Sequence, residues 1–254
     1  MRFRLSLLYL VFVLTASAQD SAPDSSKIEV TLSWWPVHTA GTIRAGGTPV
    51  DFQSDLGVNQ NAPTFSGKLD LKLGNRNRVR MEGTPFRLDG TRSLPQSITY
   101  QGRTFAINDR VTSTADLNYF YAGYQFDFIA RPGGHLGLEA GGAYLNATGS
   151  ITSQVAGVTA SRSETVGMPL AGIAFRTFPL HGRFDLEING EIKGMNFGAY
   201  GHYVQASANI GAGVKHVLLE AGYRIVNADI HQTNGLNAVT PEFRGPVASL
   251  LLRM

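Results

Sequence analysis

The feature that most constrains this chain is a strict alternation of apolar and polar residues, which is clearest between residues 184 and 193. One face of that segment carries Phe184, Leu186, Ile188 and Ile192, while charged side chains fall between them. Successive side chains of a β-strand point to opposite faces, whereas an α-helix repeats about every 3.6 residues. The pattern therefore predicts a strand. Similar alternation over residues 65–73, 203–214 and 217–225 predicts an all-β chain.

Connecting segments between the alternating stretches are short and long in turn. Short connections lie near residues 74–77, 131–134, 180–183 and 214–216, and long ones near 45–63, 91–109, 150–162 and 233–241, with a briefer one at 198–201. Tight turns on one side and longer loops on the other are typical of bacterial outer-membrane barrels. The segments between the connections predict ten antiparallel strands, at residues 28–44, 64–74, 77–90, 110–129, 135–149, 163–178, 183–197, 201–214, 217–232 and 241–254.

Two details leave the strand count and register open. Residues 97–107 read as a hairpin around Gln101-Gly102-Arg103, and twelve strands would result if that hairpin entered the membrane. Eight strands would result if one pair were merged. Between Tyr119 and Tyr124 the apolar residues move from odd to even positions. A β-bulge would explain this change, and so would a wrong assignment of which face is inside.

The N-terminal residues predict export. Arg2 and Arg4 precede an apolar run from Leu5 to Leu14, and small residues follow up to Ala18. This is the pattern of a secretory signal peptide over residues 1–18. Residues 19–26 then read as a short disordered leader, and residues 27–254 as the barrel domain. The two leader arginines reduce the formal charge from +3 to +1 when they are removed. The charge balance gives no reason to expect a nucleic-acid partner.

Composition narrows the class of protein further. Only 16% of residues are charged, there are 29 glycines, and there is no cysteine. A disulfide scaffold is excluded, and a disordered acidic tail is unsupported. After the leader no apolar run reaches even twelve residues, so any membrane crossing must be made by strands. The predicted strands reach ten or more residues, which suits a membrane barrel better than the five to six residues of an average globular strand.

Together these segments resemble a small outer-membrane β-barrel protein of Gram-negative bacteria. The resemblance implies a transmembrane antiparallel barrel in the cell outer membrane, in contact with membrane lipid and lipopolysaccharide and assembled by the outer-membrane insertion machinery. Such chains usually end on an aromatic residue, whereas this one ends on Met254. The alternative is a secreted soluble β-barrel that binds a small apolar ligand.

The alternation assigns side chains to the two faces of the predicted wall. The residues expected to face lipid are Phe184, Leu186, Ile188, Ile192, Val204, Ile210, Leu219 and Ile225. The interior is expected to hold a network of both charge signs, made of Lys68, Asp70, Lys72, Arg80, Glu82, Asp116, Glu139, Asp185, Glu187, Glu191, Lys193, Glu220 and Arg224.

A barrel of about ten strands is close to the size that side chains can fill. The charges are therefore expected to form ion pairs that largely plug it, because an unpaired buried charge costs several kcal/mol. This favours a structural or surface-interaction role, and a narrow pore for small solutes is the alternative. The surface ligand is not identified by any motif.

Catalytic signals are weak. Asp229-Ile230-His231 near the end of a strand resembles the Asp-x-His pair of omptin-like surface proteases, and Asp89 lies near the end of another strand. The Asp-x-Asp pair that would face it in that family does not accompany Asp89. The six histidines show no metal-ligand spacing. We therefore predict no enzyme activity, no metal site and no cofactor.

Overall fold

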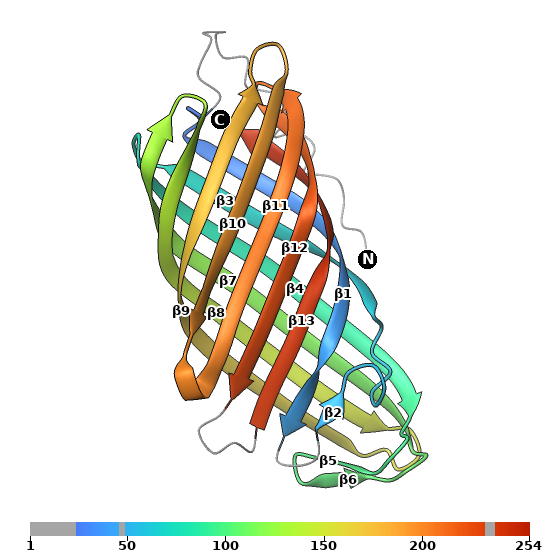
Figure 1. The fold of residues 1–254 in the computed structure, drawn as a ribbon. Helices are drawn as coiled ribbons and strands as arrows, with labels where there is room; N and C mark the ends of the chain where they lie inside the picture. Colours follow the sequence, from blue (N-terminus) through green and yellow to red (C-terminus); the bar gives the residue numbers. More distant parts are fainter. Residues whose placement is uncertain (1–23, 46–48, 232–236) are drawn as a thin grey trace, which may run out of the picture.

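The computed structural model describes residues 24–45, 49–231 and 237–254, and these form a closed barrel of ten antiparallel strands (Figure 1). Each strand pairs with the next, and the last pairs with the first. This confirms the prediction of an all-β, ten-stranded barrel. The strands are β1 (Ile28–Ala45), β3 (Asn61–Lys72), β4 (Asn77–Ser93), β7 (Arg110–Arg131), β8 (Gly134–Ser153), β9 (Thr159–Leu180), β10 (Asp185–Asn196), β11 (Gly201–Val214), β12 (Val217–His231) and β13 (Asn237–Arg253).

Four small elements lie in the connections. Strand β2 (Val50–Asp51) pairs with β1, and the 3-10 turn η1 (Gly198–Tyr200) joins β10 to β11. Strands β5 (Ile98–Tyr100) and β6 (Arg103–Phe105) form the predicted hairpin, and the positive φ angles of Gln101 and Gly102, 50° and 71°, suit a tight turn. Because this hairpin is a sheet of its own, the twelve-stranded alternative is wrong. Within the described residues, no helix is long and apolar enough to cross a membrane.

The two ends of the barrel differ. We call the end with the short β3–β4, β7–β8, β9–β10 and β11–β12 connections the turn end, and the opposite end the loop end (Figure 1). The C-terminal residue lies at the turn end, where Met254 O accepts hydrogen bonds from the backbone N–H groups of Lys27 and Ile28. The long loop predicted over 150–162 is wrong. β8 and β9 continue through it to Thr152 and Thr159, which are paired, and Ile151 and Ala160 are buried inside the barrel.

The polarity of the wall reverses part-way along the strands. In the half next to the turn end, here the turn half, Gln125 and Asp127 of β7 are fully buried inside while Phe126 is exposed outside. In the half next to the loop end, the loop half, Val111 and Leu117 of the same strand are buried inside. Outward aromatic side chains lie where the pattern changes, namely Trp34, Phe120, Tyr144 and Tyr223.

This reversal decides between the two explanations of the parity change at residues 119–124, because the structure has no bulge there. The register of β7 on β8 is continuous from Val111 opposite Ser153 to Asp127 opposite Gly137. Odd-numbered side chains point inward throughout, and the apolar residues change parity because the environments of the two faces exchange. The irregularity of this strand pair lies instead between Asp127 and Ile129, next to the turn end.

Candidate functional site

The eight residues predicted to face lipid lie on the outer wall of the barrel. Phe184 and Leu219 have the largest exposed fractions among them, 68% each, and Leu186 is half-buried. All belong to the strands β10, β11 and β12 or to the turn that precedes β10. Their shared direction follows from alternation, because the intervening Asp185, Glu187 and Glu220 are buried inside.

Lys193 lies at the centre of a cluster of interior charges. Its Nζ is 2.7 Å from Glu82 Oε2 and 2.7 Å from Glu191 Oε1, and the side chain is fully buried. The ammonium also lies 4.2 Å from the centroid of the Tyr121 ring. Glu82 is held further by Arg224, whose Nη1 is 3.3 Å from Glu82 Oε1. One cation therefore neutralises two carboxylates that belong to nearly opposite walls of the barrel, β4 and β10.

Arg80 lies at the centre of a second cluster in the turn half. It contacts Asp70 Oδ1 at 2.6 Å, Glu139 Oε2 at 2.7 Å and Glu191 Oε2 at 2.8 Å, so four strands meet at one guanidinium. Lys68 lies at the edge, 3.8 Å from Asp70 and 3.9 Å from Glu191. Because Glu191 contacts both Lys193 and Arg80, the two clusters form one network.

Several interior charges were missed by the sequence analysis. Arg176 of β9 contacts Glu29 of β1 at 2.5 Å and Glu187 at 2.9 Å, and Arg253 contacts Asp185 at 2.5 Å. Arg78, Asp127 and His135 are also buried inside. Alternation extended from Arg80 to the turn end would have found Arg78, because the two fall in phase on β4. No interior charge was assigned on β9, so Arg176 had no such reference.

Asp24 is a further missed residue and corrects the predicted disordered leader over 19–26. Its side chain is 3% exposed and contacts Arg78 at 2.6 Å and His135 at 3.2 Å, with Lys72 and Arg176 at 3.6 and 3.7 Å. Burial alone would raise the pKa of Asp24, but the hydrogen bond to His135 and the neighbouring positive charges lower it well below the ordinary value. The ion pairs fix this residue inside the turn end. Residues 19–23 and the predicted signal peptide lie outside the described residues.

A wide pocket of about 650 Å³ opens at the mouth of the turn end, beside Asp24, Lys72 and Arg131, but the spaces within the network are small. Within the described residues, two small voids lie between the charged side chains of the network, each of about 20 Å³. Lys68, Arg176, Asn189, Glu191 and Ser207 line both. Such a polar void has room for about one water molecule. The arrangement therefore fills the turn half with paired charges.

Twelve of the thirteen predicted interior charges point inward, and Asp116 is the exception. It lies on the outer wall of the loop half, where its Oδ1 is 3.8 Å from Arg87 Nε and its side chain is 49% exposed. The prediction was wrong because it applied the turn-half polarity to a position beyond the reversal. There Ala115 and Leu117 turn inward and the carboxylate faces out.

The predicted catalytic residues are only partly brought together. His231 Nε2 lies 2.9 Å from Asp229 Oδ1, with both side chains about one-third exposed on the outer wall of β12. Asp89 is exposed on the outer wall of β4, and β13, β1 and β3 lie between the two strands on the shorter way round. Asp89 therefore does not face the pair. Among the described residues, no group of three or more His, Asp or Glu side chains could hold a metal ion.

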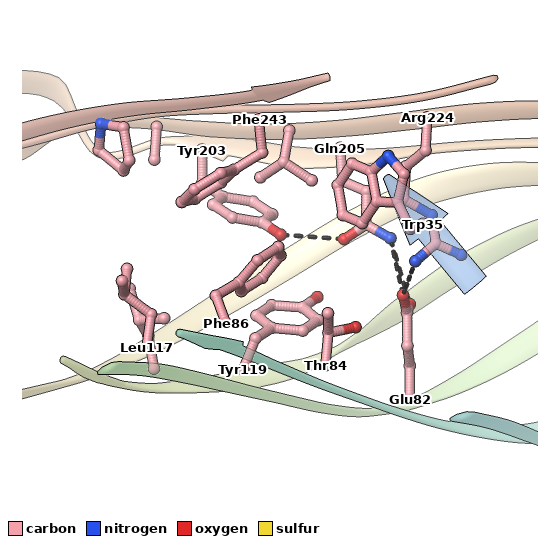
Figure 2. Close-up of a pocket in the computed structure, with 14 residues that line it drawn as sticks. Trp35, Glu82, Thr84, Phe86, Leu117, Tyr119, Tyr203, Gln205, Arg224 and Phe243 are labelled. Atoms are coloured by element: carbon pink, nitrogen blue, oxygen red, sulfur yellow. Dashed lines mark hydrogen bonds and ion pairs between the residues drawn. The ribbon is translucent and has the colours of Figure 1, made fainter. Parts of the chain in front are cut away.

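On the loop side of the charged network the interior becomes mostly apolar, as Figure 2 shows. Phe86 stacks on Phe243 with ring centroids 4.5 Å apart and meets Trp35 edge-on at 5.6 Å. Tyr203 Oη donates to Gln205 Oε1 at 2.9 Å, and Gln205 Nε2 donates to Glu82 at 3.1 Å (Figure 2). A void of about 30 Å³ lies among these side chains.

A larger cavity of about 150 Å³ adjoins that void on the loop side. The two share Leu117, Leu145 and Pro241 in their walls. The charged network therefore ends at the Glu82–Gln205–Arg224 layer, and the space beyond it is lined mostly by apolar side chains. The sequence analysis missed this cavity because it depends on the reversal of the wall and on how closely the loops pack.

Similarity to known structures agrees with the fold. No protein-family model matches the chain, and no curated protein matches it either. Outer membrane protease OmpT from Escherichia coli has a TM-score of 0.54 at 13% identity, over 91% of this chain and 97% of that one.

Two further structures score below 0.5. The NalP translocator domain of Neisseria meningitidis has a TM-score of 0.47 at 13% identity, over 91% of this chain and 90% of that one. The transport unit of AIDA-I of Escherichia coli has 0.46 at 9% identity, over 98% and 93%. The chain has the fold of a small bacterial outer-membrane β-barrel, which supports an outer-membrane location.

Proposed function

We propose that this chain is an integral outer-membrane barrel closed by its own ion pairs, with a structural or surface-interaction role. The observation that carries the proposal is the set of ion pairs that cross the lumen. Arg176 and Glu29 stand on β9 and β1, five strands apart in a ring of ten, and Lys193 reaches Glu82 four strands away. A solute could pass only by breaking these contacts, at several kcal/mol for each charge left unpaired.

The outer wall of the turn half is the surface that supports membrane insertion. Exposed side chains such as Leu32, Phe65, Ile210 and Leu219 would be unfavourable in water and are suited to lipid. A secreted soluble barrel would need a polar outer wall along its whole length, so the membrane location is preferred. We propose outer-membrane lipid and lipopolysaccharide as its surroundings, and the insertion machinery as an assembly partner.

Conductance in planar lipid bilayers tests the closed barrel. The purified protein, shown to be folded by a mobility shift on boiling, is expected to give no discrete current steps in concentrated KCl. The double variant Glu82→Ser/Lys193→Ser removes both members of a cross-lumen pair and serves as the comparison. Current steps from the folded wild-type protein would reject the plug and favour the narrow small-solute pore.

We propose no protease activity for this chain, although a structure of similar fold is described as a protease. The Asp229–His231 pair lies on the outer wall and Asp89 points out from a distant strand. The folded protein is expected to leave a fluorogenic peptide library uncleaved. Cleavage by the wild-type protein that is lost in Asp229→Asn and in His231→Asn would overturn this.

A further inference from the structure

The apolar cavity of the loop half has the features of a binding site for a small molecule. It measures about 150 Å³, and Ile43, Leu117, Leu145, Val166 and Val239 from five strands of the barrel form its wall. Phe52 and Tyr100 come from outside the barrel wall, from the segment that follows β2 and from the β5–β6 hairpin. Both side chains are buried, at 8% and 3% exposed.

Three charged residues line this cavity, and one of them, Arg44, is exposed to solvent. Arg162 Nε donates to Glu164 Oε1 at 2.5 Å, and this pair also lines the cavity. Because these two side chains pair with each other and the rest of the wall is largely apolar, a charged ligand would lose its hydration without a free buried partner. Burial raises the pKa of the Tyr100 phenol, so this hydroxyl is neutral at physiological pH.

The size of the cavity limits its occupant. An apolar cavity of about 150 Å³ has room for benzene or xenon, and the loop-half cavity has that volume. A long acyl chain is too large, and the barrel wall separates this space from the lipid that surrounds the turn half. The charged layer of Glu82, Gln205 and Arg224 lies beyond the smaller void and closes the way toward the turn end.

We propose that the loop-half cavity binds an uncharged, single-ring aromatic molecule or an apolar molecule of similar size. The ring would lie among the Phe52, Leu117 and Leu145 side chains, with the β5–β6 hairpin as one part of the cover. Binding here is independent of whether the turn half conducts, because the two sites lie on opposite sides of the charged layer.

Iodobenzene and fluorobenzene are the probes that test this site. Crystals soaked in iodobenzene are expected to show an anomalous iodine peak inside the cavity. Ala147→Leu fills the cavity, because Ala147 lines it next to Leu117 on the neighbouring strand. Ala40→Leu is the matched control, because Ala40 faces outward on β1 in the loop half. The peak should be absent in the first variant and retained in the second.

Fluorine NMR supplies the measurement in solution. Fluorobenzene added to detergent-solubilised protein is expected to give a saturable bound signal with the wild-type protein and Ala40→Leu. Binding to Ala147→Leu should be weaker by about ten-fold or more, because overpacking of a filled site has that order of cost. Detergent background is the same in all three samples and cancels.

A replacement variant and two contrary results complete this test. If Ala147→Leu does not fold, as judged by mobility on boiling, Ala115→Leu replaces it, since Ala115 lines the same cavity. A wild-type protein without a peak in the cavity overturns the proposal. Equal binding by the wild-type protein and a folded cavity-filling variant overturns it as well, because the ligand would then lie elsewhere.

Discussion

In the turn half, Glu187 and Lys193 are fully buried inside the barrel while Ile188 and Ile192 face outward. In the loop half, Trp35 and Phe86 are buried inside while Arg87 and Asp116 are exposed outside. The strands run without interruption from one half to the other, with the same inward and outward alternation. The backbone is therefore common to both, and the environment of the outer wall distinguishes them.

The difference follows from what each half can gain by burial. In water, moving apolar side chains to the interior removes them from solvent, at roughly 25 cal/mol per Å². In lipid this gain is absent because the hydrocarbon is as apolar as the core. There the interior can hold paired charges, and apolar side chains occupy the outer wall. On the proposed membrane location, the reversal would mark the level at which the barrel leaves the membrane.

The largest effect on the contrast between the two halves is expected when the cation at the centre of the turn half is removed. Lys193→Met would leave Glu82 and Glu191 without their shared partner, and the loss of one member of a buried pair costs about 3–5 kcal/mol. Urea unfolding in detergent, followed by mobility on unheated gels, measures the change in unfolding free energy.

The matched control lies in the loop half. Arg87→Met removes an exposed partner of Asp116 and should change the unfolding free energy by about 1 kcal/mol or less. Equal losses for the two variants would contradict the contrast between a buried network in one half and surface charges in the other.

The strand pattern and the strand count could be predicted from the sequence because alternation is a local property. Twelve interior charges could be assigned as well, since each stands between outward apolar neighbours, as Glu187 does between Leu186 and Ile188. Alternation fixes which residues share a face. Which face is inside depends on the solvent around the wall, and that changes along each strand.

The failures have the same origin. Asp116 was placed inside because one rule of polarity was applied to both halves. For the same reason the parity change in β7 left both a bulge and a wrong assignment of the faces open. Asp24 was assigned to a leader, although its partners Arg78, His135 and Arg176 lie more than fifty residues away in the chain. Contacts so distant in sequence leave no local pattern.

A charge introduced on the outer wall tests where the boundary between the two halves lies relative to the lipid. Ile210→Arg places a cation at a position 53% exposed on the apolar wall of the turn half. Arginine on the lipid face of a barrel costs about 2–4 kcal/mol near the bilayer midplane. Ser161→Arg, on the exposed outer wall of β9 in the loop half, should cost almost nothing.

Refolding into phosphatidylcholine vesicles over a urea series measures both variants. If Ser161→Arg lowered the free energy of unfolding as much as Ile210→Arg, the loop half would also lie in lipid. The assignment of the reversal to the membrane surface would then be wrong.

Acid should lower the stability of the turn end through Asp24. We expect this effect to be smaller than those of Lys193→Met and Ile210→Arg. Its carboxylate faces Arg78, His135, Lys72 and Arg176, and its pKa is lowered below the ordinary value of 3.8. A lowered pKa in the folded state contributes stability above pH 3.8, and this stability is lost as the pH falls further.

Asp24→Asn should therefore cost about 2 kcal/mol at pH 7, the scale of hydrogen bonds to charged groups. In urea unfolding curves, the difference in unfolding free energy between the variant and the wild-type protein should narrow below about pH 4, because the stabilising charge of Asp24 is then lost. Other carboxylates titrate in both proteins and cancel in this difference. A difference that stayed constant down to about pH 2 would mean that the Asp24 charge does not stabilise the turn end.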